Sequence, residues 1–135
     1  MERAPQVKSN PWEVARFAEA GDGRHICFVT RRPRPDRSTR EAAEEDLESL
    51  TAGGFANFRF TTASLAGRSA ARLDYEQRDA GRIWAGRHYY LAVDGISFVL
   101  HLGSSVPEED AGLFDDIAAG FRLLAPAQGA GDSRR

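Results

Sequence analysis

Residues 55–103 read FANFRFTTASLAGRSAARLDYEQRDAGRIWAGRHYYLAVDGISFVLHLG, and their pattern decides the fold. Apolar and polar side chains alternate through this stretch with a period of two, which is typical of strands that bury one face. Glycine-containing breaks interrupt the alternation at 66–67, 79–81 and 94–95. Such breaks are typical of hairpin turns, and the Asp-Gly pair at 94–95 is a strong two-residue turn signal. The stretch therefore predicts a meander of four antiparallel strands.

An amphipathic helix is predicted just before the meander. Ser38, followed three residues later by Glu41, has the form of a capping box, in which two side chains satisfy free amide groups at a helix start. Ala43, Leu47 and Leu50 are spaced to share one face of this helix. A pair of glycines then provides a typical helix end.

A second amphipathic helix is predicted after the meander, starting at Ser105 or Val106. Pro107 is preorganised for the first helical turn, and the acids that follow it are favoured at a helix N-terminus. The apolar stripe of this helix comprises Phe114, Ile117, Ala118 and Phe121. The predicted fold class is therefore α+β, with an antiparallel sheet meander flanked by amphipathic helices.

Two interpretations of residues 11–20 stay open. The sequence Asn-Pro-Trp-Glu at 10–13 has the form of a helix start. The alternative is a strand that turns at 21–23 and returns over 24–31 as a hairpin. We favour the hairpin, because apolar residues alternate in the returning segment.

Length and composition predict a single domain. The chain has 135 residues, of which 41% are hydrophobic, enough to bury one core. The domain is expected to span 11–124. Residues 1–10 and 125–135 are expected to be disordered, because they carry too little apolar surface to offset the entropy of ordering.

Charge and cysteine usage exclude several classes of protein. Eighteen basic and 20 acidic side chains leave a formal net charge of -2, so we expect no nucleic-acid partner and no membrane partner. Cys27 is the only cysteine, which excludes an internal disulfide. No apolar run reaches the roughly 18 residues of a membrane span. We therefore expect a cytoplasmic protein.

The predicted meander brings two histidines together. A two-residue turn at 94–95 places His88 opposite His101, and a three-residue loop at 79–81 places Arg72 opposite His88. On this register one sheet face carries a polar and aromatic patch that comprises Arg72, Asp74, Glu76, Trp84, His88, Tyr90 and His101.

This patch has two interpretations. Two histidines and a carboxylate can bind a divalent ion or exchange protons near neutral pH, so the first is a ligand, partner or metal site. The second, which we favour, is the ordinary wetter face of an antiparallel sheet. A shift of one residue at either turn would dissolve the patch.

Residues 31–40 are the second candidate site. They are expected to form a loop, because two prolines there each remove a backbone donor. Five arginines in this segment are candidates for gripping phosphate or an acidic partner, namely Arg31, Arg32, Arg34, Arg37 and Arg40. The alternative is a solvated loop whose charge is balanced by the five acids of residues 41–50.

The sequence contains no catalytic motif that we can identify. It has no glycine-rich phosphate loop, no HExxH and no GxSxG. Cys27 lies in an apolar run, where a small buried thiol is more common than a nucleophile. We therefore predict no cofactor, no metal and no catalytic residue.

The run LAGRSAARLDY at 65–75 has the spacing Leu-x-Gly-x-x-Ala-x-x-Leu-x-Tyr. A tyrosine-rich strand, an apolar strand and a last helix ending in Phe121 and Arg122 follow it. With these features the chain, from about residue 24 to 124, resembles the PsbP-like and Mog-type superfamily, which includes small bacterial LpqN/DcrB-like domains. The matching residues are packing and turn positions, and the cysteine of the lipoprotein members is absent.

The resemblance implies an α/β/α sandwich around a central antiparallel sheet. It also implies a non-catalytic binding or accessory module that acts through protein–protein interaction, with a protein partner of unknown identity or a second copy as a homodimer. The alternative is a small-molecule or metal-binding protein, or an enzyme, that uses the face of His88 and His101.

Overall fold

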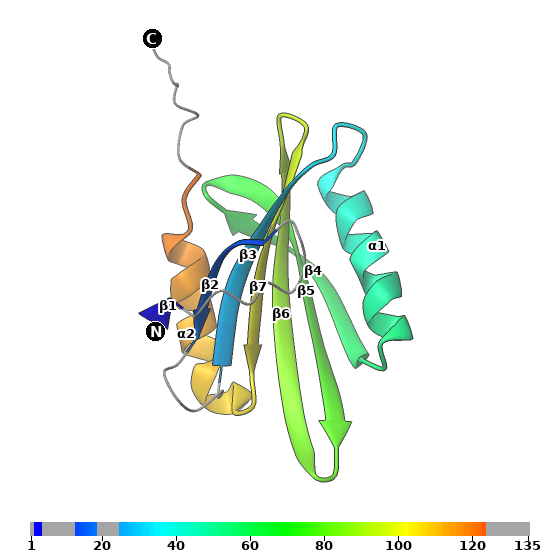
Figure 1. Ribbon diagram of the computed structural model, residues 1–135, viewed down its shortest axis with the longest axis vertical. Helices are drawn as coiled ribbons and strands as arrows, with labels where there is room; N and C mark the ends of the chain where they lie inside the picture. Colours follow the sequence, from blue (N-terminus) through cyan, green and yellow to red (C-terminus); the bar gives the residue numbers. More distant parts are fainter. Residues whose placement is uncertain (1, 4–12, 19–24, 124–135) are drawn as a thin grey trace.

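The computed structural model describes residues 2–3, 13–18 and 25–123, which form two helices and one seven-stranded sheet (Figure 1). The strands are β1 (Glu2–Arg3), β2 (Glu13–Ala18), β3 (His25–Pro33), β4 (Ala56–Leu65), β5 (Arg68–Asp79), β6 (Arg82–Val93) and β7 (Ile96–Ser104). The helices are α1 (Thr39–Ala52) and α2 (Pro107–Gly120). Neither is long and apolar enough to cross a membrane.

All neighbouring strands pair antiparallel, in the order β1-β2-β3-β7-β6-β5-β4. The predicted meander of four strands is confirmed as β4 to β7. Three two-residue turns join these strands, and both residues of each turn have positive φ, for example 51° at Asp94 and 77° at Gly95. Positive φ at both central residues is the geometry that matches the twist of a hairpin.

The turn between β5 and β6 is one residue shorter than the sequence predicts. Asp79 pairs with Arg82, so only Ala80 and Gly81 remain in the turn. Ala80 adopts a left-handed backbone with φ of 51°, a conformation that alanine rarely takes. The register of β5 against β6 therefore differs by one residue from the predicted register.

This shift corrects the predicted patch. Leu73, not Arg72, lies opposite His88, whereas the predicted pairing of His88 with His101 is confirmed. Since successive side chains of a strand point to opposite faces, Arg72, Asp74 and Glu76 lie on the other face of the sheet from His88.

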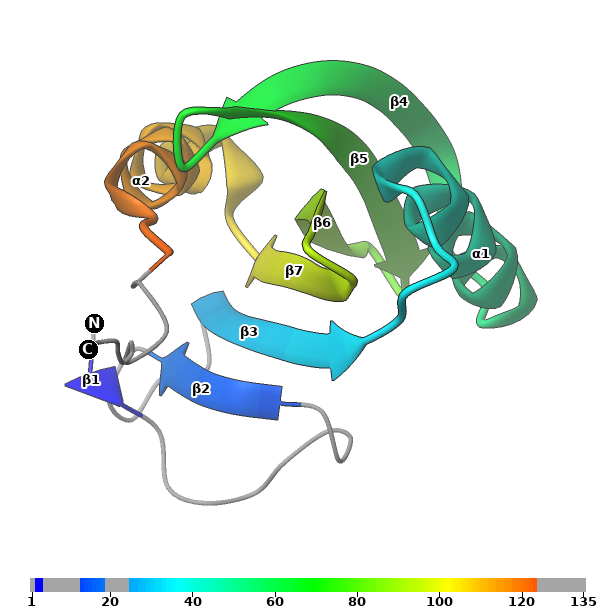
Figure 2. The same cartoon turned by 90° about the horizontal axis from the view of Figure 1, so that it is seen from above.

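The two helices pack on opposite faces of the sheet, on either side of β6 and β7 (Figure 2). Towards α1 the core contains Ala43, Ala71, Leu73 and Tyr90, with Leu47, Leu50, Phe58 and Val99 packed against it. Towards α2 it contains Cys27, Leu65, Ala70, Tyr89, Leu91, Leu100, Leu102, Phe114 and Ala118. The arrangement is the predicted α/β/α sandwich.

The predicted start of the first helix is confirmed. Ser38 is the N-cap of α1, its hydroxyl accepts from the amide of Glu41 at 3.1 Å, and the Glu41 carboxylate accepts from the amide of Ser38 at 2.9 Å. The second helix has Val106 as N-cap and Pro107 in its first turn, but no side chain caps it.

Residues 13–18 form a strand, so the hairpin interpretation of this segment is confirmed. Strand β2 pairs with β3, with Ala18 opposite Ile26 and Phe17 opposite Cys27. Residues 2–3 form β1 beside β2. The remainder of 1–10, the turn expected at 21–23 and the tail at 125–135 lie outside the described residues.

The expected loop at 31–40 is shorter than predicted. Strand β3 continues through Arg31 and Arg32 to Pro33, which lies opposite Ile96 of β7. A proline is tolerated there because it stands at the end of the strand. The loop is confined to residues 34–38, and Arg40 belongs to α1.

Candidate functional site

The polar centre of the molecule is His88 of β6, which is only 5% exposed beneath α1. Its Nδ1 lies 2.8 Å from Oδ2 of Asp46 on α1, and its Nε2 lies 2.8 Å from the hydroxyl of Tyr75 on β5. Tyr90 also donates its hydroxyl to Oδ2 of Asp46. Asp46 of α1 is therefore hydrogen-bonded to two residues of β6.

A second histidine extends this cluster toward β3. Nδ1 of His101 lies 3.3 Å from Nε2 of His88, and Nε2 of His101 lies 3.3 Å from the hydroxyl of Thr30. The ring of Phe28 stacks on His101 with centroids 4.2 Å apart. When Nδ1 of His88 donates to the Asp46 carboxylate, its Nε2 is left as an acceptor, and the Tyr75 hydroxyl at 2.8 Å is the nearer donor to it.

Two glycines leave the space that the aromatic rings of this cluster occupy. A Cβ on Gly86 would lie 2.1 Å from Cζ of Tyr75, so the phenol reaches His88 only because residue 86 has no side chain. A Cβ on Gly103 would likewise lie 2.5 Å from Cζ2 of Trp84. The alternation of side chains along β6 and β7 places Trp84, His88, Tyr90 and His101 on one face of the sheet.

Burial and hydrogen bonding shift several pKa values in this cluster. Burial alone would raise the pKa of Asp46, but hydrogen bonds from His88 and Tyr90 outweigh it and hold that pKa below its usual value. Burial, followed by the nearby Asp46 charge, raises the pKa of both Tyr75 and Tyr90. The tyrosines therefore remain protonated donors and the carboxyl remains a carboxylate at neutral pH.

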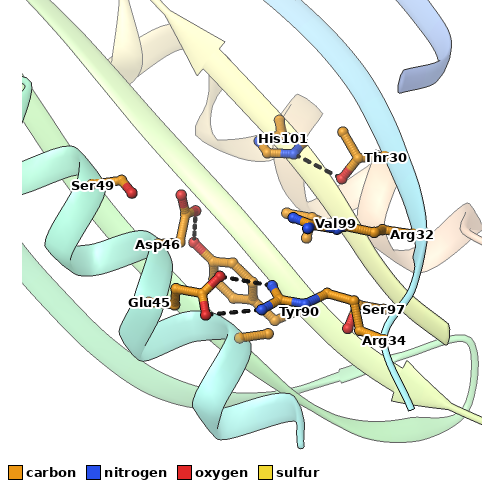
Figure 3. A pocket seen from close by; sticks show the side chains of 11 residues that line it. Thr30, Arg32, Arg34, Glu45, Asp46, Ser49, Tyr90, Ser97, Val99 and His101 are labelled. Carbon is orange, nitrogen blue, oxygen red and sulfur yellow. Dashed lines mark hydrogen bonds and ion pairs between the residues drawn. The ribbon is translucent and has the colours of Figure 1, made fainter. Parts of the chain in front are cut away.

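A cavity of about 180 Å³ lies beside this cluster, between α1 and the neighbouring strands β3 and β7 (Figure 3). We call it the α1 cavity. Its lining consists of Thr30, Arg32, Arg34, Ala42, Glu45, Asp46, Ser49, Tyr90, Ser97, Val99 and His101. The α1 cavity is therefore lined both by His101 and by two arginines of the segment 31–40, Arg32 and Arg34.

Ser97 is the unusual member of this lining. The residue is 5% exposed, and its hydroxyl is the one buried side-chain polar atom in the described part of the chain without a hydrogen-bond partner in the protein. An unsatisfied buried hydroxyl costs about 1–3 kcal/mol.

Arg72 and Asp74, predicted to join the histidines, form a separate ion-pair group on the α2 side. Asp74 accepts from Arg72 at 2.9 Å and from Arg87 at 3.0 Å. Arg87 also donates to Asp115 of α2 at 2.7 Å. This group links the sheet to α2 in the way that Asp46 links it to α1.

Three of the five predicted basic residues bond to acids of α1. Arg34 makes a two-pronged pair with Glu45, at 2.8 and 2.9 Å, and Arg37 adds a bond of 3.2 Å to the same carboxylate. Arg40 pairs with Glu44 at 3.0 Å. Acids of α1 thus pair with three of the five arginines of this segment.

The chemistry available at the cluster is hydrogen bonding and proton exchange. Among the residues that the structure describes, no group of three or more His, Cys, Asp or Glu side chains is arranged to hold a metal ion. Cys27 is buried in the α2-side core, and burial raises the pKa of its thiol to about 11, so it is a protonated packing residue at neutral pH.

Sequence reasoning missed two residues of this site, Asp46 and Ser97. A signal for the first was present: Asp46 stands three residues after Ala43 and four before Leu50, which puts it on the inner stripe of the helix rather than among the solvated acids. Nothing in the local sequence distinguishes Ser97 from a solvent-facing strand serine.

No protein-family model and no curated protein matches the sequence. Solved structures share the fold at low identity, and three of them are compared with this chain. Cyanobacterial PsbP (CyanoP) from Synechocystis sp. PCC 6803 is 11% identical, with a TM-score of 0.67 over 90% of this chain and 81% of that one. PA94 from Pseudomonas aeruginosa, a protein of unknown function described as a candidate regulator, is 14% identical, with a TM-score of 0.62 over 90% of each chain.

The third is LpqN from Mycobacterium tuberculosis, described as involved in cell envelope biogenesis. It is 18% identical, with a TM-score of 0.50 over 86% of this chain and 72% of that one. At these identities the similarity shows the fold alone. The chain has a PsbP-like and LpqN-like fold, as the resemblance in its sequence predicts.

Proposed function

We propose that the protein is a non-catalytic accessory module that works by binding another protein. The observation that carries this proposal is the enclosure of His88, which is 5% exposed and has both ring nitrogens engaged by side chains of the protein. A general base must reach the proton that it removes from a substrate. His88 instead joins α1 to the sheet, which leaves the outer surface to carry the function.

The descriptions of PA94, CyanoP and LpqN, three proteins of similar fold, support the same class of role. One is described as a candidate regulator, one as a PsbP and one as involved in envelope biogenesis, and none is described as an enzyme. The specific role of each of these proteins is not transferred to this chain. An accessory or binding role is the part that we carry over to this chain.

The edge strand β4 is the surface that we propose for the partner. It stands at one end of the sheet, and no described strand pairs with its outer side (Figure 2). An edge strand offers free backbone donors and acceptors, to which an extended segment of a partner can add as a further strand. Except for Leu65, its residues are exposed or half-buried.

Phe60 gives this edge an apolar anchor. At 36% exposed it is the one exposed large apolar side chain of the described residues. The guanidinium of Arg40 lies 5.5 Å from the centre of its ring. A partly exposed aromatic next to an arginine has the composition of a binding hot spot.

Affinity purification of the full chain from its native host, followed by reconstitution with the purified partner, tests the proposal. We expect a stoichiometric complex whose affinity falls by about tenfold or more in Phe60→Ser. Asp116→Ser, an exposed change on α2, is the matched control and is expected to leave the affinity unchanged. Light scattering during gel filtration distinguishes a different protein from a second copy of this chain.

Two results would contradict this proposal. The first is a complex that Phe60→Ser leaves intact, which would place the partner elsewhere on the surface. The second is a turnover of a small molecule by the purified protein that His88→Gln abolishes while the fold is retained, which would make the histidine cluster an active site.

A further inference from the structure

The edge strand β4 offers regular backbone hydrogen-bonding groups along part of its length. Asn57, with φ of 56°, interrupts the pairing with β5 between Ala56 and Arg59, so the regular edge begins at Arg59. Leu65 and Arg68 flank a two-residue turn, and every second pair from there exchanges backbone hydrogen bonds with β5. The residues whose backbone groups point away from β5 are therefore Phe60, Thr62 and Ser64.

The side chains between these three positions lie on the face of the sheet that α2 covers. Ala63 packs against the α2-side core, and since side chains alternate along a strand, Arg59 and Thr61 lie on the same face. A strand added outside β4 would place every second side chain next to these residues, at the closely spaced positions of an antiparallel ladder. A partner segment would therefore meet Arg59, Thr61 and Ala63 directly.

Arg59 is an exposed cation that has no ion-pair partner among the residues that the structure describes. Asp74 lies opposite it on β5, but this carboxylate accepts from Arg72 and Arg87. Glu76, the next acid on this face of β5, is likewise hydrogen-bonded to other side chains. A carboxylate on a partner strand would supply the charge complement that Arg59 lacks within the described part of the chain.

A hollow lies farther along the same face, about four residues or 13 Å from Arg59. Helix α2 stands beside the turn that ends β4 (Figure 2), and the hollow between them has a volume of about 410 Å³. We call it the α2 hollow. Ala63 and Ala66 line it from the sheet, and Ala118 and Ala119 line it from α2.

The charged groups that line the α2 hollow are engaged within the protein. Asp115 accepts from Arg87 at 2.7 Å, and Arg122 donates to the backbone carbonyls of Ala119 and Phe121, each at 2.8 Å. The volume exceeds the roughly 300 Å³ at which pockets begin to hold small molecules, so it has room for one large side chain. Because its charges are already paired, the α2 hollow favours an apolar side chain.

We propose that the partner adds to β4 as an antiparallel strand with an acidic residue opposite Arg59 and a large apolar residue opposite Ala63, at the α2 hollow. The apolar residue then precedes the acidic one by four positions, since both lie on the same face. This inference rests on the proposed function, because it specifies the chemistry of the segment that binds β4.

A second copy of this chain does not supply such a segment from its own β4. Arg59 is the only charged residue of that strand, so two β4 edges would bring together cations and no acid. The chemistry of the edge therefore favours a different polypeptide.

Calorimetric titration of the full chain with the capped peptide TFTVVET tests the proposal. Paired antiparallel with β4, the phenylalanine of the peptide lies opposite Ala63 and its glutamate opposite Arg59. We expect saturable binding with a Kd below about 1 mM. The peptide TFTVVKT, with lysine in place of glutamate, should bind about fivefold or more weakly, because like charges then face each other.

A charge reversal on the protein tests the same contact from the other side. Arg59→Glu should lose about fivefold or more in affinity for TFTVVET and should prefer TFTVVKT. Arg82→Glu, an equal change at an exposed position of β6, is the matched control and should keep the preference of the wild type.

A second pair of variants tests the α2 hollow. Ala119→Phe places a bulky side chain in the lining of the α2 hollow and should weaken the binding of TFTVVET severalfold. Ala111→Phe, at an exposed position of the same helix outside that lining, should leave the affinity unchanged. Equal melting temperatures would show that both variants keep the fold.

The purified native partner separates this inference from the proposed function. A complex that weakens in Phe60→Ser but not in Arg59→Glu would support the partner surface and overturn the chemistry inferred for the partner segment. A complex that both variants leave intact would contradict the proposed function itself. With the peptides, the absence of saturable binding, equal affinities of the wild type for TFTVVET and TFTVVKT, or equal losses in Arg59→Glu and Arg82→Glu would each overturn the inference.

Discussion

The carboxylate of Asp46 on α1 and the imidazole of His88 on β6 are hydrogen-bonded at 2.8 Å across the interface between helix and sheet, 42 residues apart in the chain. Both side chains are largely removed from solvent, at 28% and 7% exposed. A buried polar pair of this kind fixes the position of a helix more strictly than apolar contacts do, because either partner left alone would lose its hydrogen bonds.

Asp46→Asn tests this role. Both hydrogen bonds end on Oδ2, and a neutral amide oxygen there accepts each of them less strongly than the carboxylate oxygen does, so we expect a loss of about 1–3 kcal/mol in the free energy of unfolding. Urea denaturation at neutral pH measures it. Glu48→Gln, an exposed change on the same helix, is the control and is expected to stay within about 0.5 kcal/mol of the wild type.

The same pair predicts a pH dependence. The pKa of Asp46 is lowered in the folded protein, so its contribution to stability is present above the unfolded-state value of 3.8 and is lost as pH falls through the folded-state pKa. Denaturation curves from about pH 5 to about pH 2 should therefore fall more steeply for the wild type than for Asp46→Asn. Parallel curves would mean that this carboxyl has the same pKa in both states.

Gly86→Ala is expected to disrupt the cluster through sterics. The new methyl group would lie 2.1 Å from Cζ of Tyr75, so the phenol must move away from His88, at a cost of about 1–3 kcal/mol. Melting curves measure the loss. Gly112→Ala, where no atom lies within 4 Å of the added carbon and the residue is in a helix, is expected to be neutral or stabilising.

A double-mutant cycle identifies the cause. In a Tyr75→Ala background the collision is gone, and Gly86→Ala should then cost little or improve stability, since glycine is a poor strand residue. Equal costs of Gly86→Ala in both backgrounds would place the requirement for glycine in the backbone rather than in its contact with Tyr75.

Local sequence signals predicted the meander, both helices and the capping box, because each depends on neighbours in the chain. The pairing of β5 with β6 was predicted wrongly because Ala80 takes a left-handed conformation that sequence patterns assign to glycine, asparagine or aspartate. That one residue decided which side chains face His88. Asp46 was missed for a related reason: its role depends on a contact 42 residues away, which helical periodicity alone does not disclose.

The turn that caused this error offers a stabilising substitution. Ala80 has φ of 51° and is exposed, and asparagine tolerates this conformation better than alanine does. Ala80→Asn should therefore raise the free energy of unfolding by about 0.5–1 kcal/mol. Ala119→Asn, in an exposed helical position, should lower it by a similar amount, and opposite signs in chemical denaturation would confirm the conformational cause.

Cys27 predicts a loss of stability at alkaline pH. Burial raises its pKa from 9.0 to about 11, because the thiolate is disfavoured in the core. The contribution of the buried thiol to the free energy of unfolding is therefore fully present below pH 9 and is lost as pH rises through about 11, since the thiol of the unfolded chain ionises first. Two pKa units correspond to about 3 kcal/mol, an upper bound on the effect.

The variant Cys27→Ala tests this prediction. The substitution creates a small void and lowers stability at neutral pH, but the stability of the variant should fall less than that of the wild type between pH 9 and pH 10. The difference between the two slopes, measured by urea denaturation at each pH, isolates the thiol from the buried tyrosines, which both proteins share. Identical slopes would show that the thiol is more accessible to water than its 5% exposure implies.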